Sequence, residues 1–182
     1  MKKHLTLYSI AVLLVSISAC NKVKDALMPA IDVDLPAFQF TIPAIPFVLP
    51  NEASLGSFTT TFNMDSIIRA KTGGAFGAGA VSTVKVKQMT IGLLNGDALN
   101  NLSNFESARF TFYSNTNSTP SEIFNVTFPD TFITSLTVNP ENGPELKEYL
   151  KGTQLTYTLY GRARRITTKP LTFNIQVTLA AK

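Results

Sequence analysis

Residues 171–179 read LTFNIQVTL, with an apolar side chain at every odd position and a polar side chain at every even position. Because successive side chains of a β-strand point to opposite faces of the sheet, this pattern predicts a strand with one face in the core and the other in solvent. Residues 155–160, LTYTLY, show the same alternation. Both runs are rich in β-branched and aromatic residues, which favour strands.

Further runs of the same period occur along most of the chain. They cover residues 38–47, 58–62, 81–94, 108–113, 124–128 and 132–138. Pro43 and Pro46 lack the backbone donor, so the first of these strands is expected at a sheet edge. About eight strands with turn-rich connections predict an all-β domain: an antiparallel β-sandwich, immunoglobulin-like in the broad sense, with one or two short helices. The chain has one Cys and no Trp, so this likeness is one of architecture only.

The run at 81–94 changes phase. Val84 and Val86 are apolar at even positions, whereas Met89, Ile91 and Leu93 are apolar at odd ones. A strand with one buried face changes parity only by inserting a residue, which predicts a β-bulge near Lys87-Gln88. The alternative is a bend at which the strand crosses from one sheet to the other.

Two short helices are predicted between the strands. The first covers residues 64–71, with Asn63 as its N-cap and Gly73-Gly74 as its stop. The second covers residues 144–151, which begin with Pro144 and are followed by Gly152. Three apolar residues of this second segment fall on one helical face and are expected to cover the core: Leu146, Tyr149 and Leu150.

The 182-residue chain has the length of one domain, and its size requires no disulfide or metal for stability. Its formal net charge is +4. Lys2 and Lys3 lie in a segment expected to be removed, which leaves 14 basic and 12 acidic residues. A charge of +2 gives no reason to expect a nucleic-acid partner.

The N-terminal residues have the pattern of a targeting signal. Lys2 and Lys3 precede an apolar run, residues 5–19, that is too short to span a bilayer and ends in small residues, as in a secretory signal peptide. A buried N-terminal helix or a short membrane anchor is the alternative. The sequence Ile17-Ser18-Ala19-Cys20 resembles the lipobox of bacterial lipoproteins. We therefore expect a signal peptide at 1–19, a lipidated N-terminus and tether at 20–35, and a β-sandwich domain at 36–182.

The resemblance implies a diacylglyceryl group on the Cys20 sulfur, cleavage between Ala19 and Cys20, and acylation of the new amine. Several acyl chains hold a protein firmly in a membrane. In such lipoproteins an Asp after the Cys can retain the protein at the inner membrane. Here that residue is Asn21, which favours the outer membrane. The acidic cluster that marks some surface-exposed lipoproteins is missing after Cys20, so the periplasmic and cell-surface faces both stay open.

The side-chain inventory argues against an enzyme. The one His, His4, lies in the expected signal peptide, and the one Cys is expected to carry lipid. A Ser-His-Asp triad, a Cys-His pair and a His- or Cys-ligated metal site are therefore excluded from the mature domain. A glycosidase that uses two carboxylates stays formally possible, but the spacing of the acids suggests no such pair. No catalytic residue, cofactor or metal is predicted.

Two groups of side chains are candidates for ligand contact. Arg162, Arg164 and Arg165, with Lys169 nearby, could bind lipid phosphates or acidic glycans. The alternative is a solvated strand end whose charges discourage edge pairing. Tyr113 and Tyr160 fall on the outward faces of their strands, where they could stack on sugar rings or pack across strands.

Two loops each allow a functional and a purely structural interpretation. The stretch from Asn95 to Asn104 is rich in side-chain oxygens, which suggests either a Ca²⁺ site or a turn; its single carboxylate before Glu106 favours the turn. Residues 73–80 hold four Gly and three Ala, as a flexible loop or the lip of a binding site would.

The leading hypothesis is a non-enzymatic envelope lipoprotein that binds another protein or supports an outer-membrane assembly. The alternatives are a carbohydrate-binding module at the cell surface and a small hydrolase that uses carboxylates alone. The residues identify neither the ligand nor the oligomeric state.

Overall fold

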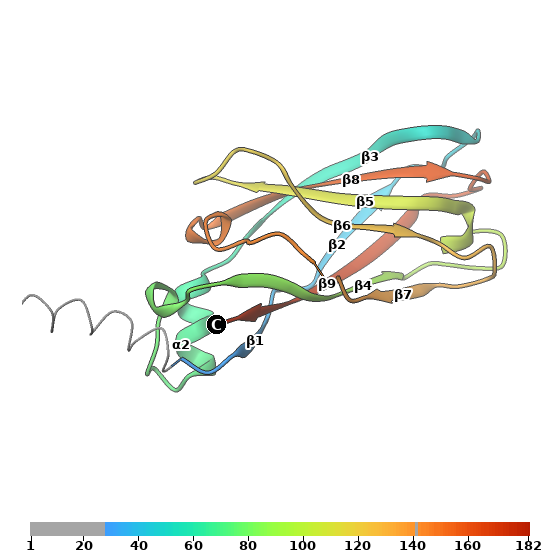
Figure 1. The fold of residues 1–182 in the computed structure, drawn as a ribbon. Coiled ribbons are helices and arrows are strands. Elements are labelled where there is room, and N and C mark those ends of the chain that lie inside the picture. Colours follow the sequence, from blue (N-terminus) through green and yellow to red (C-terminus); the bar gives the residue numbers. More distant parts are fainter. Residues whose placement is uncertain (1–27, 141) are drawn as a thin grey trace, which may run out of the picture.

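The computed structural model describes residues 28–140 and 142–182. Within them, nine strands form two antiparallel sheets that pack face to face (Figure 1). The predicted antiparallel β-sandwich is thus confirmed.

The five-stranded sheet is built around its last strand. β9 (Leu171–Ala181) pairs on one side with both β1 (Ile31–Asp34) and β2 (Phe38–Ile42), and on the other with β4 (Val84–Leu93). β7 (Ser135–Val138) pairs with the outer side of β4. β2 therefore lies at an edge, as predicted, but it ends at Ile42, before Pro43 and Pro46, whereas the predicted strand continued to residue 47. β7 begins later than the predicted strand 132–138, and Phe132 is 60% exposed in the loop before it.

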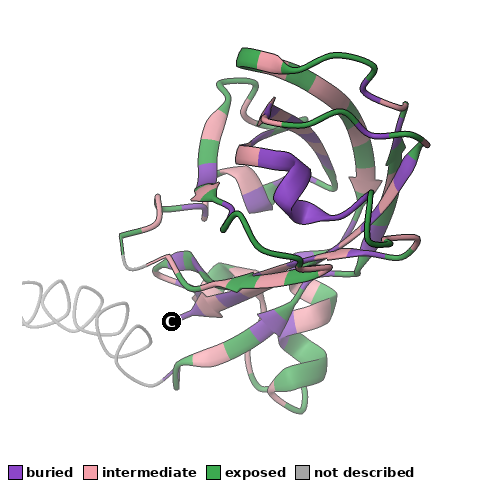
Figure 2. Cartoon of the chain, turned by 90° about the vertical axis from the view of Figure 1, so that its right-hand side faces the viewer, coloured by how far each residue is buried: buried purple, intermediate pink, exposed green. Residues whose placement is uncertain are grey.

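The four-stranded sheet has the order β3 (Leu49–Thr61), β8 (Gln154–Ala163), β5 (Phe105–Ser114) and β6 (Ser121–Thr127). The apolar residues of β5, β8 and β9 face the other sheet and are buried there. Figure 2 shows buried residues alternating with more exposed ones along the strands. Aromatic rings join the two sheets: Phe40 of β2 stacks on Phe58 of β3 at 5.0 Å and on Phe173 of β9 at 5.2 Å between ring centroids. Tyr157 is almost fully buried beside the rings of Phe38, Phe58 and Phe112, and burial raises the pKa of its hydroxyl.

The predicted bulge in β4 is confirmed. Val86 lies opposite Leu179 and Gln88 opposite Thr178, so Lys87 is the inserted residue. Lys87 and Gln88 are both exposed, while Val86 and Met89 on either side are buried. β4 stays paired with β9 before and after the bulge, so the alternative, a crossing between sheets, is wrong.

The first predicted helix is confirmed and the second is wrong. α2 (Met64–Lys71) begins at Asn63, whose side chain accepts a hydrogen bond from the Ser66 amide, and the chain leaves it through Gly73 and Gly74 with φ of 61° and 84°. Residues 144–151 instead form only the single turn η3 (Tyr149–Lys151), because the Leu146 amide pairs with the Val84 carbonyl beside β4. Two further 3₁₀ turns are η1 (Ala78–Ala80) and η2 (Leu102–Asn104). The predicted apolar cover nevertheless exists, since Leu146 and Leu150 are buried and Tyr149 contacts Phe112.

The expected boundary between tether and domain, after residue 35, is also wrong. β1 lies within the expected tether, where Val33 is fully buried opposite Leu179 and Met28 is buried as well. The folded domain therefore includes residues 28–35. The predicted cleavage and lipidation residues, Ala19 and Cys20, lie outside the described residues.

The sandwich has two distinct ends (Figure 1). We call the end that holds β1, α2, η1 and the C-terminal residue Lys182 the proximal end, and the opposite end the distal end. The distal end holds four loops, which join β2 to β3, β4 to β5, β6 to β7 and β8 to β9.

Candidate interaction surface

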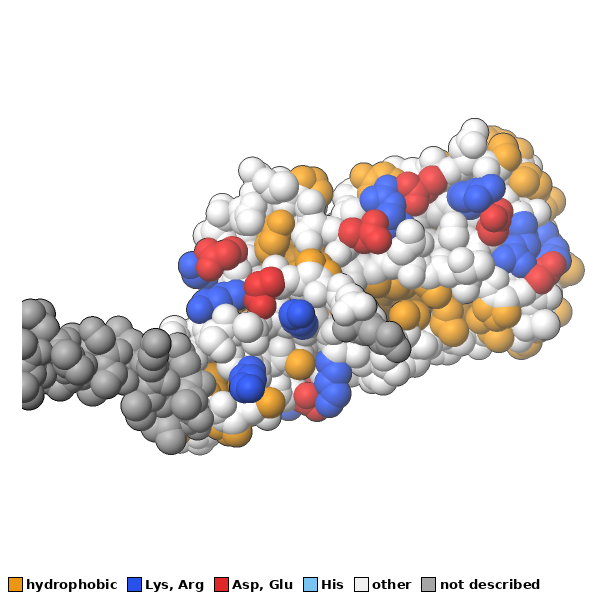
Figure 3. All heavy atoms as spheres, in the orientation of Figure 1, with side chains coloured by type: hydrophobic (Ala, Val, Ile, Leu, Met, Phe, Trp, Pro, Cys, Tyr) orange, Lys and Arg blue, Asp and Glu red, His pale blue; other side chains and the backbone are white. Residues whose placement is uncertain are grey.

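Large hydrophobic side chains are exposed mainly at the distal end. Within the described residues seven such side chains are exposed, and all but Tyr113 lie on the four distal loops or directly beside them. Hydrophobic spheres accordingly appear at the right-hand end of Figure 3. We call these six residues the distal patch: Phe47, Val48, Leu94, Leu99, Phe132 and Ile166, with exposed fractions between 49% and 71%. Single exposed apolar residues are ordinary, but a group of them marks an interaction surface.

A buried polar network supports the distal patch. Asn100, Asn101, Ser103, Asn104 and Thr167 are all buried under it. The Asn104 side-chain amide donates to the carbonyl oxygens of Leu99 at 3.0 Å and Ile166 at 2.7 Å. Its side-chain oxygen accepts from the Asn101 amide, and the Asn101 side chain caps η2 through the Ser103 amide. No buried side-chain nitrogen or oxygen in the described part of the chain lacks a hydrogen-bond partner.

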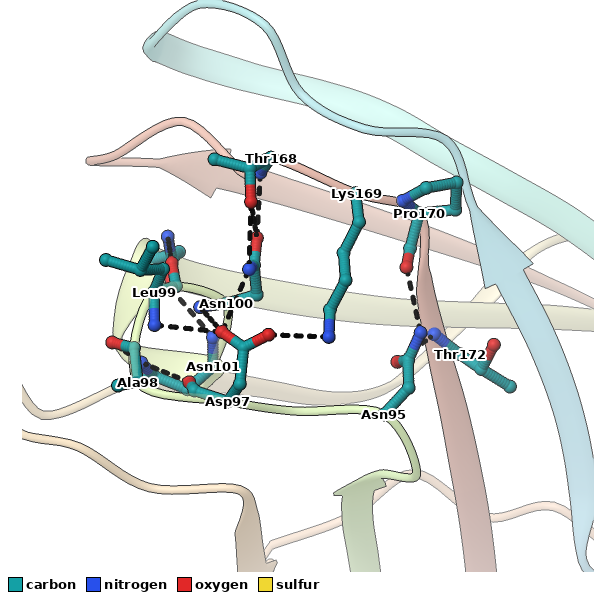
Figure 4. Close-up of polar contacts among 11 residues, drawn as sticks. Asn95, Asp97, Ala98, Leu99, Asn100, Asn101, Thr168, Lys169, Pro170 and Thr172 are labelled. Carbon is teal, nitrogen blue, oxygen red and sulfur yellow. Dashed lines mark hydrogen bonds and ion pairs between the residues drawn. The ribbon is translucent and has the colours of Figure 1, made fainter.

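Asp97 organises the loop between β4 and β5 (Figure 4). One carboxylate oxygen accepts from the amides of Leu99 and Asn100, and the other lies 2.6 Å from the Lys169 ammonium. Lys169 and the Asn100 side chain hold the pKa of the Asp97 carboxyl well below its usual range. Asp97 thus joins this loop to the one between β8 and β9.

The side-chain oxygens of the Asn95–Asn104 loop already have protein donors. Asn95 accepts from the Thr172 amide and Asn100 from the Thr168 amide (Figure 4). Such contacts are those of a tightly hydrogen-bonded turn, the alternative that the sequence favoured over Ca²⁺. The described residues contain no group of three or more His, Cys, Asp or Glu side chains that could hold a metal ion.

Backbone hydrogen bonds join all four distal loops. The amide of Thr167 donates to the Ile45 carbonyl at 2.9 Å, and the Ile45 amide donates to the Thr167 hydroxyl at 2.8 Å. The Leu102 amide donates to the Ile133 carbonyl at 2.9 Å, and the Arg165 amide donates to the Asn104 carbonyl at 3.0 Å, which links the two pairs of loops. Because the loops are held against one another, the distal patch is preorganised, which reduces the entropy lost when a partner binds.

The predicted arginine cluster holds loops together. Arg162 pairs with Glu106 at 3.1 Å, while Arg164 and Arg165 both pair with Asp130. The two later arginines also donate to main-chain carbonyls, of Phe128 and Ser103 respectively. Figure 3 shows basic and acidic side chains side by side at this end. Guanidinium groups that are already paired with carboxylates do not form the anion-binding patch that the sequence offered as one interpretation.

The two candidate tyrosines are separate. Tyr160 lies opposite Arg109, and Tyr113 lies opposite Thr156, so they are about 13 Å apart along the sheet. The Arg109 guanidinium, held by Glu52, covers the Tyr160 ring at 4.3 Å from its centroid. The structure therefore does not bring Tyr113 and Tyr160 together as a platform for a sugar.

A polar recess of about 680 Å³ lies on the five-stranded sheet beside the bulge. Its charged side chains pair with each other: Lys87 with Asp32 at 2.6 Å, and Lys71 with Asp34 at 3.2 Å. A hydrogen bond from Thr178 and the contact with Lys71 lower the pKa of Asp34. Because these charged side chains are already paired with one another, the recess is a weaker candidate site than the distal patch.

Sequence reasoning did not find the distal patch. Phe47 and Phe132 were assigned to strands, and Leu99 to a polar loop. The available signal was the presence of large apolar residues in segments that also carry Pro, Asn or Asp, such as Pro46-Phe47 and Asp130-Thr131-Phe132.

No helix in the described residues is long and apolar enough to cross a bilayer. Compared with known proteins, the chain matches no family model and no curated sequence. Among solved structures, it is similar to the decameric BFDV capsid protein, with 7% identity over 85% of this chain and 99% of that chain and a TM-score of 0.33. The 60-mer of the BFDV capsid protein gives 9% identity over 84% and 91% of the two chains, also with a TM-score of 0.33. Likeness at this level carries no inference about function.

Proposed function

We propose that this protein is a lipid-anchored, non-enzymatic binding or assembly module of the bacterial envelope, and that its distal patch docks a protein partner. The observation that supports the proposal is the gathering of six exposed apolar side chains on loops that are hydrogen-bonded to one another. Monomeric proteins seldom expose such a group without a binding role.

The charges around the distal patch define the partner's chemistry. Arg164 and Arg165 are paired with Asp130, and Lys169 is paired with Asp97. A strongly charged partner would have to break these pairs. An apolar surface with a polar rim would instead bury Leu99, Phe132 and their neighbours at roughly 25 cal/mol for each Å² removed from water. Binding should therefore depend little on salt concentration.

The proposed lipid anchor would direct the distal patch away from the membrane. The described chain begins at the proximal end, only eight residues after Cys20. An acylated Cys20 would therefore hold the proximal end near the bilayer and leave the distal patch at the far side. Mass spectrometry of the native protein should find a mature chain that begins at an acylated Cys20. Cys20→Ser should remain uncleaved and unacylated, and normal processing of that variant would contradict the anchor.

Co-purification tests the docking surface. The wild-type protein and the double variant Leu99→Ser/Phe132→Ser are extracted in mild detergent and compared by quantitative proteomics. Because both side chains are exposed, the double variant should fold normally and lose the partner. Tyr113→Ser removes an exposed aromatic ring away from the distal patch and is the matched control. A partner retained equally by all three proteins, or none recovered with the wild type, would contradict the proposal.

A further inference from the structure

The proximal end contains a cavity of about 420 Å³ that has no part in the proposed docking. It lies between α2, η1, η3 and the start of β4. Its floor is apolar and buried, formed by Met64, Val81, Val84 and Leu150. Its size is within the range of cavities that hold small molecules, about 300–1,000 Å³.

The Gly-rich segment, residues 73–80, forms one wall of the cavity. Ala78 and Gly79 of η1 line the cavity. The Asp65 carboxylate of α2 accepts a hydrogen bond from the Ala78 amide at 2.8 Å, which fixes the start of this wall. A Cβ atom placed on Gly79 would meet no other atom within 4 Å. The wall therefore leaves open space beside the apolar floor, as the lip of a binding site would.

The remaining lining residues are cationic. Lys147 and Lys151 complete the cavity, and no acidic residue in the described part of the chain lines it. Lys151 pairs with the Glu148 carboxylate at 2.6 Å, whereas the Glu145 side chain accepts from the backbone amides of Val84 and Lys147. Among the described residues, Lys147 is therefore the lining ammonium group without a carboxylate partner. An apolar floor beside such a group is complementary to a molecule with one apolar and one anionic end.

We propose that this cavity binds an amphiphile with an unbranched aliphatic chain and an anionic head group. The chain would lie against Met64, Val81 and Leu150, and the head group would contact Lys147. A carboxylate and a phosphate ester share this chemistry, so a free fatty acid and a single-chain phospholipid are the two sources to distinguish.

Methionine-methyl NMR provides a direct test. The chain has four Met residues, of which Met64 lines the cavity and Met89 is fully buried on β4 outside the lining. Full-length protein in phosphatidylcholine nanodiscs is titrated with decanoate, decyl phosphate and uncharged decanol. Decanoate or decyl phosphate should shift the Met64 methyl signal saturably and leave Met89 unchanged. The tighter of the two ligands identifies the source, and decanol should bind more weakly.

A lysine variant tests the head-group contact. Lys147→Gln should weaken binding of the anionic amphiphile about two- to fivefold, as for an exposed ion pair, and leave decanol binding unchanged. Lys85→Gln is the matched control, because Lys85 is exposed next to Val84 but does not line the cavity. The proposal is overturned if no probe shifts the Met64 methyl signal saturably, or if Lys147→Gln binds the anionic probes as tightly as the wild type does.

Discussion

The side-chain amide of Asn104 lies 2.7 Å from the carbonyl oxygen of Ile166, a residue 62 positions later in the chain. Asn104 is buried, whereas the side chain of Ile166 is about half exposed. The same amide also holds the carbonyl of Leu99. One buried side chain therefore positions the backbone of two apolar residues of the distal patch. This explains how loops without regular secondary structure can present a preorganised surface.

Asn104→Ala should destabilise the protein markedly. It removes the part-buried hydrogen bonds that the side chain donates to the Leu99 and Ile166 carbonyl oxygens, and it leaves the buried Asn101 amide without its side-chain acceptor. We expect a loss of about 2–3 kcal/mol in the free energy of unfolding, measured by chemical denaturation. Asn125→Ala on β6 is the control, because Asn125 is exposed, and should change stability by less than about 0.5 kcal/mol. Equal stability of the two variants would show that the network does not support the fold.

Deletion of single residues in β4 tests the bulge. Without Lys87, Val86 and Gln88 would keep their present partners in an unbroken ladder, and Met89 would still face the core. This deletion should cost about 1 kcal/mol or less, since the pair with Asp32 that it removes is exposed. Deletion of Thr90 would instead turn Ile91 and Leu93 outward and should abolish cooperative unfolding in calorimetry. If both deletions were equally harmful, the assigned register would be wrong.

The pH dependence of stability should reveal Asp97. Its pKa is lower in the folded protein than the ordinary value of 3.8, because Lys169 and Asn100 stabilise the carboxylate. The resulting stabilisation is complete above the unfolded pKa and is lost as the pH falls through the folded pKa. Wild type should therefore be more stable than Asp97→Asn at pH 6, by a margin that narrows below about pH 4. In a Lys169→Gln background, the loss of stability that Asp97→Asn causes at pH 6 should be smaller. If the stability difference between wild type and Asp97→Asn did not change with pH, the assigned role of Asp97 would be wrong.

Local sequence pattern predicted the strands because one rule, alternation, governs burial along each of them. It even located the inserted residue in β4, since parity has to change there. The rule fails where a distant segment decides the outcome. Residues 144–151 have a helical pattern of the same length as α2, but the start of β4 holds this segment through the hydrogen bond from the Leu146 amide to the Val84 carbonyl.

The distal patch depends even more on distant segments. Whether Ile166 is exposed depends on Asn104 and Thr167, and Thr167 in turn is held by Ile45. Four loops far apart in sequence contribute, and no local period connects them. Arg164 and Arg165 are neighbours in the sequence, but their common partner, Asp130, is supplied by a different loop.

Site-specific photo-crosslinking in intact cells tests the docking role of the distal patch most directly. A photoreactive amino acid is placed at position 99, at position 132 or, as the control, at position 113. The same protein product should be captured from positions 99 and 132 and be missing from position 113. Capture at position 113 alone, or no capture at either patch position, would show that the distal end is not where this protein meets its partner.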